Sequence, residues 1–338
     1  VAVILLAYLL VTRRGLARRA YPGLAIYAAA ALLAAAPVLQ YARLHSAEFW
    51  KRTREESVFR GKPLAKGLVD LRDNVRLNLL MFNYKGDMNG RHNLPGEPLL
   101  DLGTGALAVL GLGYSLRYLG RPWSLLLLLW FFIMLVPAVF SLRSEAPHAL
   151  RAVGVLPVVY LFALVAIHRV WQLWDASFAS RGRLVFVGLL LMGLAAVGYI
   201  NYDQYFQRYA ESRRAWEDFW PRETYVARRL AEPGSQGVAA YTTSAWNLYF
   251  TRSFLAPKSQ DPRIIESPSD LPIQTGPRRA LLFIDPRKGE IWQRAQQCYL
   301  GVPVIRFQGP EDGGPPLLLI LDLDASQIRQ GLARCPPR

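Results

Sequence analysis

Apolar residues gather in long blocks over the first 200 residues of the chain, and short basic connections separate these blocks. One block, "WSLLLLLWFFIMLVPAVF", contains no charged residue. Because a helix needs about 20 apolar residues to cross the hydrocarbon core of a bilayer, the pattern predicts a polytopic α-helical membrane protein. We place five or six spans, the first of them incomplete, at residues 1–11, 21–39, 102–116, 123–140, 152–167 and 184–200.

The connections after the first, third and fifth spans carry most of their charge as arginine. Cytoplasmic connections are enriched in Lys and Arg, and these three fall on one side of the membrane if the spans alternate. We therefore predict a multi-pass protein of the plasma (inner) membrane, with these connections in the cytoplasm. The basic residues are Arg13, Arg14, Arg18, Arg19, Arg117, Arg121, Arg169, Arg181 and Arg183, against Asp175.

This orientation places residues 43–101, residues 141–151 and everything after residue 201 on the outer face. Within the outer loop 43–101, "HSAEFWKRTREESVF" predicts an amphipathic helix, which either lies in the membrane interface or packs on a neighbouring loop. The apolar run 75–82 is too short to span and is interpreted as interfacial or re-entrant.

The pattern changes after residue 200. Short apolar runs such as "RRALLFID" and "PLLLILDLD" alternate with helical stretches such as "GEIWQRAQQC", and Pro and Gly stand between them. Alternation of strands and helices predicts an α/β domain with a partly parallel sheet. The predicted organisation is a transmembrane region, 1–200, followed by an extracytoplasmic α/β domain, 201–338.

Composition supports a membrane protein. The 338 residues are 52% hydrophobic and 19% charged, with a formal net charge of +15. No basic stripe interleaved with aromatic residues stands out, so nucleic acid is not a predicted partner. Because Val1 opens inside an apolar run and no signal peptide is recognisable, we interpret the chain as a fragment that lacks N-terminal spans.

Two cysteines, Cys298 and Cys335, lie in the predicted outer domain. A disulfide is stable outside the cytoplasm, and two unrelated buried thiols are the alternative.

The candidate chemistry lies in two polar groups next to spans. One consists of Asp87, Asn89, Arg91, His92 and Asn93, and the other of Arg143, Glu145, His148 and Arg151. Arginine suits a phosphate because its guanidinium donates two parallel hydrogen bonds; the alternative is that these are solvated loop charges. The four histidines are scattered along the chain, so no metal-ligating cluster is predicted, and no nucleotide-binding loop is present.

Three segments resemble a known family. "GDMNGRHNLPGEPLLDLGTGALAVLGLGYSL", "EFWKRTREESVF" and "APHALRAVGVLPVVYLFALVA" resemble, in this order, segments of family 39-like glycosyltransferases, which are protein-mannosyltransferase-like membrane enzymes of the GT-C class. The similarity covers roughly residues 36–166. The Arg-His-Asn-Leu-Pro-Gly motif is its most specific part.

The resemblance implies an enzyme that transfers a sugar from a polyprenyl-phosphate donor, embedded in membrane lipid, to an acceptor on the outer face. The catalytic carboxylate of the family lies in an N-terminal loop that this chain lacks, so the fragment is expected to be inactive alone. No cofactor is implied beyond the lipid-linked donor. A divalent metal is compatible with the family, although no ligand set in the sequence argues for one.

Residue by residue, the resemblance assigns Arg151 to the donor phosphate and Arg91, His92 and Asn93 to the wall of the outer cavity. Arg143 and His148 complete the predicted substrate-binding set, and Asp87 fits an ion pair with Arg91 better than a general base. The family's Tyr after the late-helix Arg is replaced by Ala152. The alternative function is a non-catalytic membrane protein whose outer domain binds a glycan or a protein; a transporter ranks last because the spans contain few ionisable residues.

Overall fold

The chain divides into two units, a helical unit (Val1–Gln207) and a sheet unit (Arg208–Arg338), whereas the sequence placed the boundary at residue 200. The computed structural model describes residues 14–232, 234, 238–243, 248–274, 278–310 and 314–336. The predicted span 1–11 and Arg13 lie outside these described residues.

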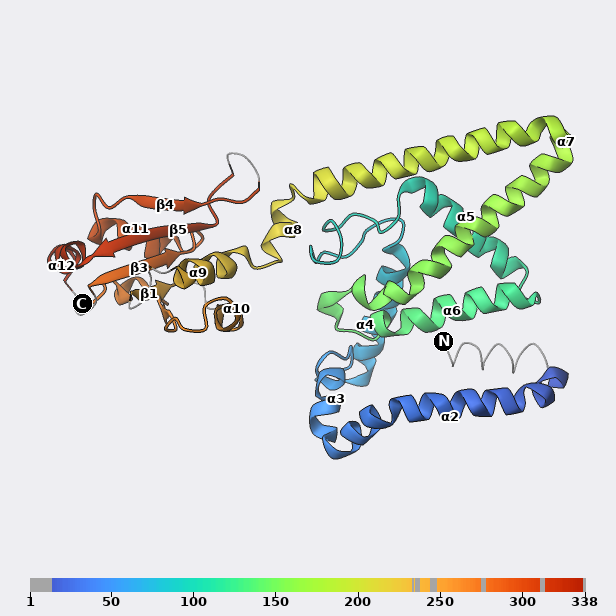
Figure 1. The fold of residues 1–338 in the computed structure, drawn as a ribbon, viewed down its shortest axis with the longest axis horizontal. Coiled ribbons are helices and arrows are strands. Elements are labelled where there is room, and N and C mark those ends of the chain that lie inside the picture. Colours follow the sequence, from blue (N-terminus) through green and yellow to red (C-terminus); the bar gives the residue numbers. More distant parts are fainter. Residues whose placement is uncertain are drawn as a thin grey trace. The chain divides into compact units, whose positions relative to one another are not determined.

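The described part of the helical unit consists of helices joined by connections of different lengths, among them the long loop 81–101 (Figure 1). Two 3-10 turns, Arg143–Glu145 and Leu150–Val155, precede the last helix of the unit. A π-helical segment, Asp203–Tyr209, continues that helix. The helices are α2 (Arg14–Leu44), α3 (Ser46–Glu55), α4 (Leu64–Leu80), α5 (Leu102–Arg117), α6 (Pro122–Val139) and α7 (Leu156–Tyr202).

Among the described residues, four helical segments are long and apolar enough to cross a membrane: Ala25–Leu44, Pro122–Val139, Leu150–Phe178 and Gly182–Tyr209. They correspond to four of the predicted spans, with the last two extending further than predicted. The predicted span 102–116 is also helical, but α5 has 16 residues, which corresponds to about 24 Å of helix. Four apolar helices of this kind indicate a membrane-associated protein.

Helix α7 contains a sharp reversal near its middle, so it supplies two of these segments (Figure 1). The rings of Trp171 and Phe186 lie 5.0 Å apart, although fifteen residues of straight helix would extend over about 22 Å. Trp174 Nε1 donates to the Gly182 carbonyl across the reversal, and Arg183 pairs with Asp175. The two halves therefore form a helical hairpin.

Helix α5 packs against the first half of α7 through small residues. Gly105, Ala108, Gly111 and Ser115 are buried along one side of α5. A Cβ atom on Gly111 would lie 1.8 Å from the carbonyl oxygen of Phe162, so only glycine permits this approach of the two backbones. Close contact through small residues is typical of helices that associate within membranes.

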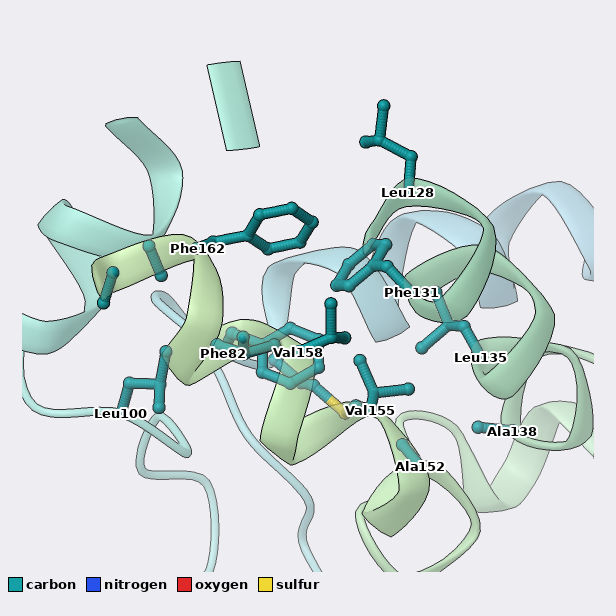
Figure 2. Packing of buried hydrophobic residues seen from close by; sticks show 14 of the residues in the cluster. Phe82, Leu100, Leu128, Phe131, Leu135, Ala138, Ala152, Val155, Val158 and Phe162 are labelled. Carbon is teal, nitrogen blue, oxygen red and sulfur yellow. The ribbon is translucent and has the colours of Figure 1, made fainter. Parts of the chain in front are cut away.

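The core of the helical unit lies where the polar loop, defined as residues 81–101, meets α6 and α7. In Figure 2 the rings of Phe82, Phe131 and Phe162 come from these three elements and gather around the Val155 and Val158 side chains. Phe131 lies 6.1 Å from Phe82 and 5.8 Å from Phe162, measured between ring centroids. The polar loop is thus anchored to the helices by its own apolar ends.

The run 75–82, interpreted from sequence as interfacial or re-entrant, forms the last turns of the ordinary helix α4 together with the start of the polar loop. The helix begins earlier than the apolar run, in the amphipathic stretch that starts at Leu64, and the interfacial position of the run stays a prediction. The predicted amphipathic helix near residue 46 is present as α3, and none of its residues is buried.

The helical unit has two chemically different ends. Arg169 lies over the ring of Tyr114, and Arg121 lies over the ring of Tyr118, which brings the α5–α6 connection to the same end as the α7 reversal. The polar loop and the connection 140–149 lie at the other end, about 27 Å away along α6. Arg121 and Arg169 thus lie at the same end of the helical unit, and the cytoplasmic side of this end stays a prediction.

The sheet unit contains a five-stranded sheet in the order β2-β1-β3-β5-β4 (Figure 1). β2 and β3 flank β1 in parallel, whereas β5 runs antiparallel to both β3 and β4. The predicted partly parallel sheet is confirmed. Its strands are β1 (Ala239–Thr242), β2 (Arg263–Ile264), β3 (Arg279–Ile284), β4 (Val304–Phe307) and β5 (Leu318–Asp324).

Helices cover the sheet and complete its core. The inner strands β3 and β5 are buried on both faces, with Leu281, Leu282 and Ile284 fully inaccessible to solvent. Cys298 at the end of α11 and Cys335 after α12 form a disulfide. Of the two alternatives that the sequence left open, a disulfide or two unrelated thiols, the structure contains the disulfide. The helices are α8 (Arg213–Glu217), α9 (Pro221–Ala231), α10 (Leu248–Leu255), α11 (Gly289–Cys298) and α12 (Ala325–Arg334).

Candidate functional site

The polar loop folds back on itself as a narrow excursion between α4 and α5. Leu99 and Leu100 donate backbone hydrogen bonds to Met81 and Phe82, and Gly96 donates to Asp87. Gly96 has a φ of +83°, which side-chain-bearing residues rarely adopt. The backbone of this loop therefore presents its tip, residues 87–95, in one defined conformation.

Asp87 is the centre of the tip, and its side chain is 5% exposed. Its Oδ1 accepts a hydrogen bond from the backbone N–H of Asn89 at 2.9 Å. Its Oδ2 accepts from the N–H of Ala149 at 2.9 Å and lies 2.8 Å from His92 Nδ1. One carboxylate thus joins the polar loop to the α6–α7 connection, across 62 positions of sequence.

His92 and His148 lie against each other, with ring centroids 4.9 Å apart and an interplanar angle of 28°. Burial lowers the pKa of the His148 imidazole below its ordinary value, against the opposing charge of Asp87. The backbone N–H of His148 donates to Asn78 Oδ1 at 3.3 Å. The expectation that the four histidines stay scattered is therefore wrong for these two, because tertiary contacts bring them together.

Two buried asparagines of α4 hold the α6–α7 connection in place. Asn74 Nδ2 donates to the carbonyls of Val139 and Ser141 at 3.0 and 2.8 Å, which satisfies carbonyl groups at the end of α6. Asn78 sits one turn later and holds His148. The sequence analysis missed both, although their four-residue spacing in an apolar helix was a usable signal.

Arg151 lies beside the histidines and pairs with two carboxylates, Glu56 and Glu145. Its guanidinium lies 3.1 Å from Glu145 Oε2, and that oxygen is also 3.9 Å from His148 Nε2. Glu56 makes a further ion pair with Arg52 at 3.3 Å. Together Asp87, His92, His148, Glu145, Arg151 and Glu56 form what we call the polar cluster.

The structure brings together three of the predicted substrate-binding residues, His92, His148 and Arg151. The other three lie around them. Arg143 is 4.0 Å from Asp73 of α4, Arg91 is exposed and donates from Nε to Asn89, and the Asn93 amide donates to the Glu97 carbonyl within the loop. Asn93 therefore supports the loop conformation, and its role in the cavity wall stays a prediction.

Within the described part of the chain, Asp87, His92 and His148 form a group able to hold a metal ion. Each offers one ligand atom, and the three atoms lie within 4.8 Å of one another. Two ring nitrogens and one carboxylate oxygen match the donor sets of zinc and related ions. From the sequence, His92 was assigned to the cavity wall, His148 to the substrate-binding set and Asp87 to an ion pair with Arg91.

An apolar cavity of about 220 Å³ lies next to the polar loop. The loop itself contributes Phe82, Asn83 and Leu100, and α5, α6 and α7 contribute aliphatic and aromatic side chains. The lining is completed by Leu79, Ala108, Val109, Leu112, Phe131, Val159 and Phe162. The same loop thus borders a polar cluster and an apolar cavity.

Comparison with protein-family models, with characterised proteins and with solved structures gives no significant match. The resemblance to family 39-like glycosyltransferases therefore depends on the quoted motifs alone.

Proposed function

We propose that this protein is a polytopic membrane glycosyltransferase, which transfers a sugar from a polyprenyl-phosphate donor to an acceptor on the outer face of the plasma membrane. The observation that carries this proposal is the position of the polar loop between the polar cluster and the apolar cavity. A lipid-linked sugar has an anionic head and an apolar tail, and such a site offers a partner to each. The resemblance of the loop motif supports the same substrate class.

The arrangement of charges supports the outer location of the site. The arginines near the α5–α6 connection and in α7 lie at the end opposite the polar cluster, and connections rich in arginine face the cytoplasm. The disulfide of the sheet unit supports an extracytoplasmic location for that unit, because disulfides are stable outside the cytoplasm.

Arg151 is the proposed contact for the donor phosphate. Glu56 and Glu145 orient its guanidinium, which has five N–H donors. Glu145 is 40% exposed and Arg151 is 21% exposed, so the donor phosphate reaches the guanidinium by competing with Glu145. Arg91 and Arg143 add positive charge around this point.

In the proposed reaction, negative charge grows on the phosphate leaving group as the bond to the sugar breaks. Guanidinium donors already held in place stabilise this charge without reorganisation, and removal of one such donor typically costs on the order of 100-fold in kcat. His92 and His148 line the same site, and the acceptor approaches from the outer side.

The test is transfer of a labelled sugar from polyprenyl phosphate, measured in membranes that contain the full-length protein. Arg151→Lys keeps the charge that Glu56 and Glu145 require but removes the two-pronged donor geometry. We expect kcat to fall on the order of 100-fold. Arg169→Lys, at the opposite end of the helical unit, is the matched control and should leave transfer unchanged.

Unchanged transfer by Arg151→Lys would remove the phosphate role of Arg151. Absence of transfer from every polyprenyl-phosphate sugar tried with the wild-type protein would contradict the proposed function itself.

The second candidate is a non-catalytic membrane protein whose sheet unit binds a glycan or a protein. The exposed aromatic rings of α10 favour it, since Phe250 and Phe254 are 72% and 85% exposed and aromatic rings provide large apolar contact surfaces. This function predicts that Phe254→Ser abolishes binding and that Arg151→Lys changes nothing.

A further inference from the structure

We propose that Asp87, His92 and His148 form a binding site for a divalent transition-metal ion such as Zn²⁺. This inference is independent of the proposed transferase activity, because it concerns metal binding alone. Two imidazoles and one carboxylate are the protein ligands of many zinc sites that keep a fourth position open for water or substrate. Mg²⁺ and Ca²⁺ prefer sites made of oxygen ligands, so they are not the ions we expect here.

The distances between the ligand atoms are close to those that such an ion requires. Ligands at about 2.1 Å in a tetrahedron lie about 3.4 Å from each other. Asp87 Oδ2 and His92 Nδ1 are 2.8 Å apart, and the nitrogen of His148 lies within 4.8 Å of both ligand atoms. An ion would separate the first pair slightly and draw His148 inward, which needs only side-chain rotations.

The groups around the ligands hold them in position. The N–H groups of Asn89 and Ala149 donate to the Asp87 carboxylate, and Asn78 holds the backbone of His148. Such outer partners set the orientation of metal ligands, and their loss typically lowers affinity about 10- to 100-fold. The site is assembled from the polar loop and the α6–α7 connection, so an ion would join these two segments.

The competing interpretation is a hydrogen-bonded Asp87–His92 pair with His148 stacked on it and no ion. The two interpretations differ in what joins Asp87 to His92. When Zn²⁺ binds a neutral His92, Nδ1 gives its lone pair to the ion and the ring proton moves to Nε2, so bonds to the ion replace the Asp87–His92 hydrogen bond. The metal interpretation therefore predicts one bound equivalent of Zn²⁺ that depends on His148, and the hydrogen-bonded pair predicts none.

The experiment uses the full chain, purified in detergent without a polyhistidine tag and freed of metal with a chelator. Zn²⁺ is added in a calorimeter, which reports the stoichiometry and the affinity. We expect one equivalent to bind. His148→Ala, His92→Gln and Asp87→Asn should each lower the affinity by at least about 100-fold.

His168→Ala is the matched control. His168 contacts Gln172 on α7 and precedes Arg169, which lies at the end of the helical unit opposite the polar cluster. The His168→Ala variant should therefore bind Zn²⁺ like the wild type. A second measurement replaces Zn²⁺ with Co²⁺, whose visible spectrum reports a tetrahedral site that His148→Ala should abolish. The near-UV circular dichroism of each metal-free variant shows whether it is folded.

Three outcomes would overturn the proposal: no Zn²⁺ bound by the wild-type protein, equal loss of binding in His168→Ala and His148→Ala, or unchanged binding in a folded His148→Ala. None of these measurements depends on sugar transfer. Failure of the metal site and failure of the proposed function are therefore distinguishable.

Discussion

The two units of this protein differ in what they bury and expose. The helical unit buries Asn74, Asn78 and Asp87 and exposes large apolar side chains along its helices, such as Leu184 and Met192, which are 83% and 64% exposed. The sheet unit buries Phe283 completely within an aliphatic core. Each arrangement suits a different solvent.

The difference shows which forces stabilise each unit. In water, burial of apolar surface is the dominant favourable term, so the sheet unit follows the usual rule. Hydrocarbon gives no gain for hiding apolar side chains, and helices there associate through close packing and hydrogen bonds between them. The contact of Gly111 with Phe162 and the amide bonds of Asn74 are interactions of that second kind.

The largest expected effect lies in the core of the sheet unit. Phe283 is completely buried in β3, and truncation of a buried Phe to Ala typically costs about 3–5 kcal/mol. Since about 1.4 kcal/mol corresponds to a tenfold change in an equilibrium constant, Phe283→Ala should lower the protection of the β3 amides against hydrogen exchange by two to three orders of magnitude or more. Phe254→Ala, at a ring that is 85% exposed, should change it little; equal effects of the two variants would contradict the buried core.

The next effect tests the solvent of the helical unit. Leu191 lies in the second half of α7 and is 60% exposed, so Leu191→Arg should place a charge in lipid at a cost of about 2.5–3.5 kcal/mol. An insertion assay that measures the inserted fraction of this segment should detect the loss. Leu300→Arg, at a side chain of the sheet unit that is 71% exposed, should change stability by less than about 0.5 kcal/mol. Normal insertion of Leu191→Arg would show that this surface faces water.

The smallest effect concerns pH and the sheet unit. Burial alone would raise the pKa of Asp285, but hydrogen bonds from Arg287 and the charge of Arg222 bring it below its ordinary value. A carboxyl whose pKa is lower in the folded state than in the unfolded state stabilises the fold at pH values above its unfolded pKa, which is near 3.9. This stabilisation is lost as the pH falls through the pKa of the folded state. Hydrogen exchange of the β3 amides, corrected for its intrinsic pH dependence, should show this loss below pH 4 and a smaller one in Asp285→Asn. The same slope in both proteins would exclude Asp285 as its source.

The sequence pattern predicted the helices and strands well where the signal is local. The uncharged block 123–140 became α6 almost residue for residue, and the apolar runs after residue 278 became β3 and β5. Length and hydropathy decide such elements within one stretch of chain. The run 75–82 alone did not show the length of its helix, because α4 begins eleven residues earlier, at Leu64.

The candidate site was only partly predictable. His92, His148 and Arg151 were chosen from their residue types and from a resemblance, but their partners were not. Asp87 reaches Ala149 across 62 positions, and Asn78 reaches His148 across 70. Contacts between residues so far apart in the sequence leave no periodic pattern in the local sequence.

The sequence by itself therefore determined the apolar blocks, the change of pattern after residue 200 and the polar motif "GDMNGRHNLPG". Only the tertiary structure decided that this motif bends back to set Asp87 against His92 and beside His148. The physical reason is that hydropathy acts residue by residue along the chain, whereas a buried carboxylate needs hydrogen-bond donors, and here they come from a distant segment.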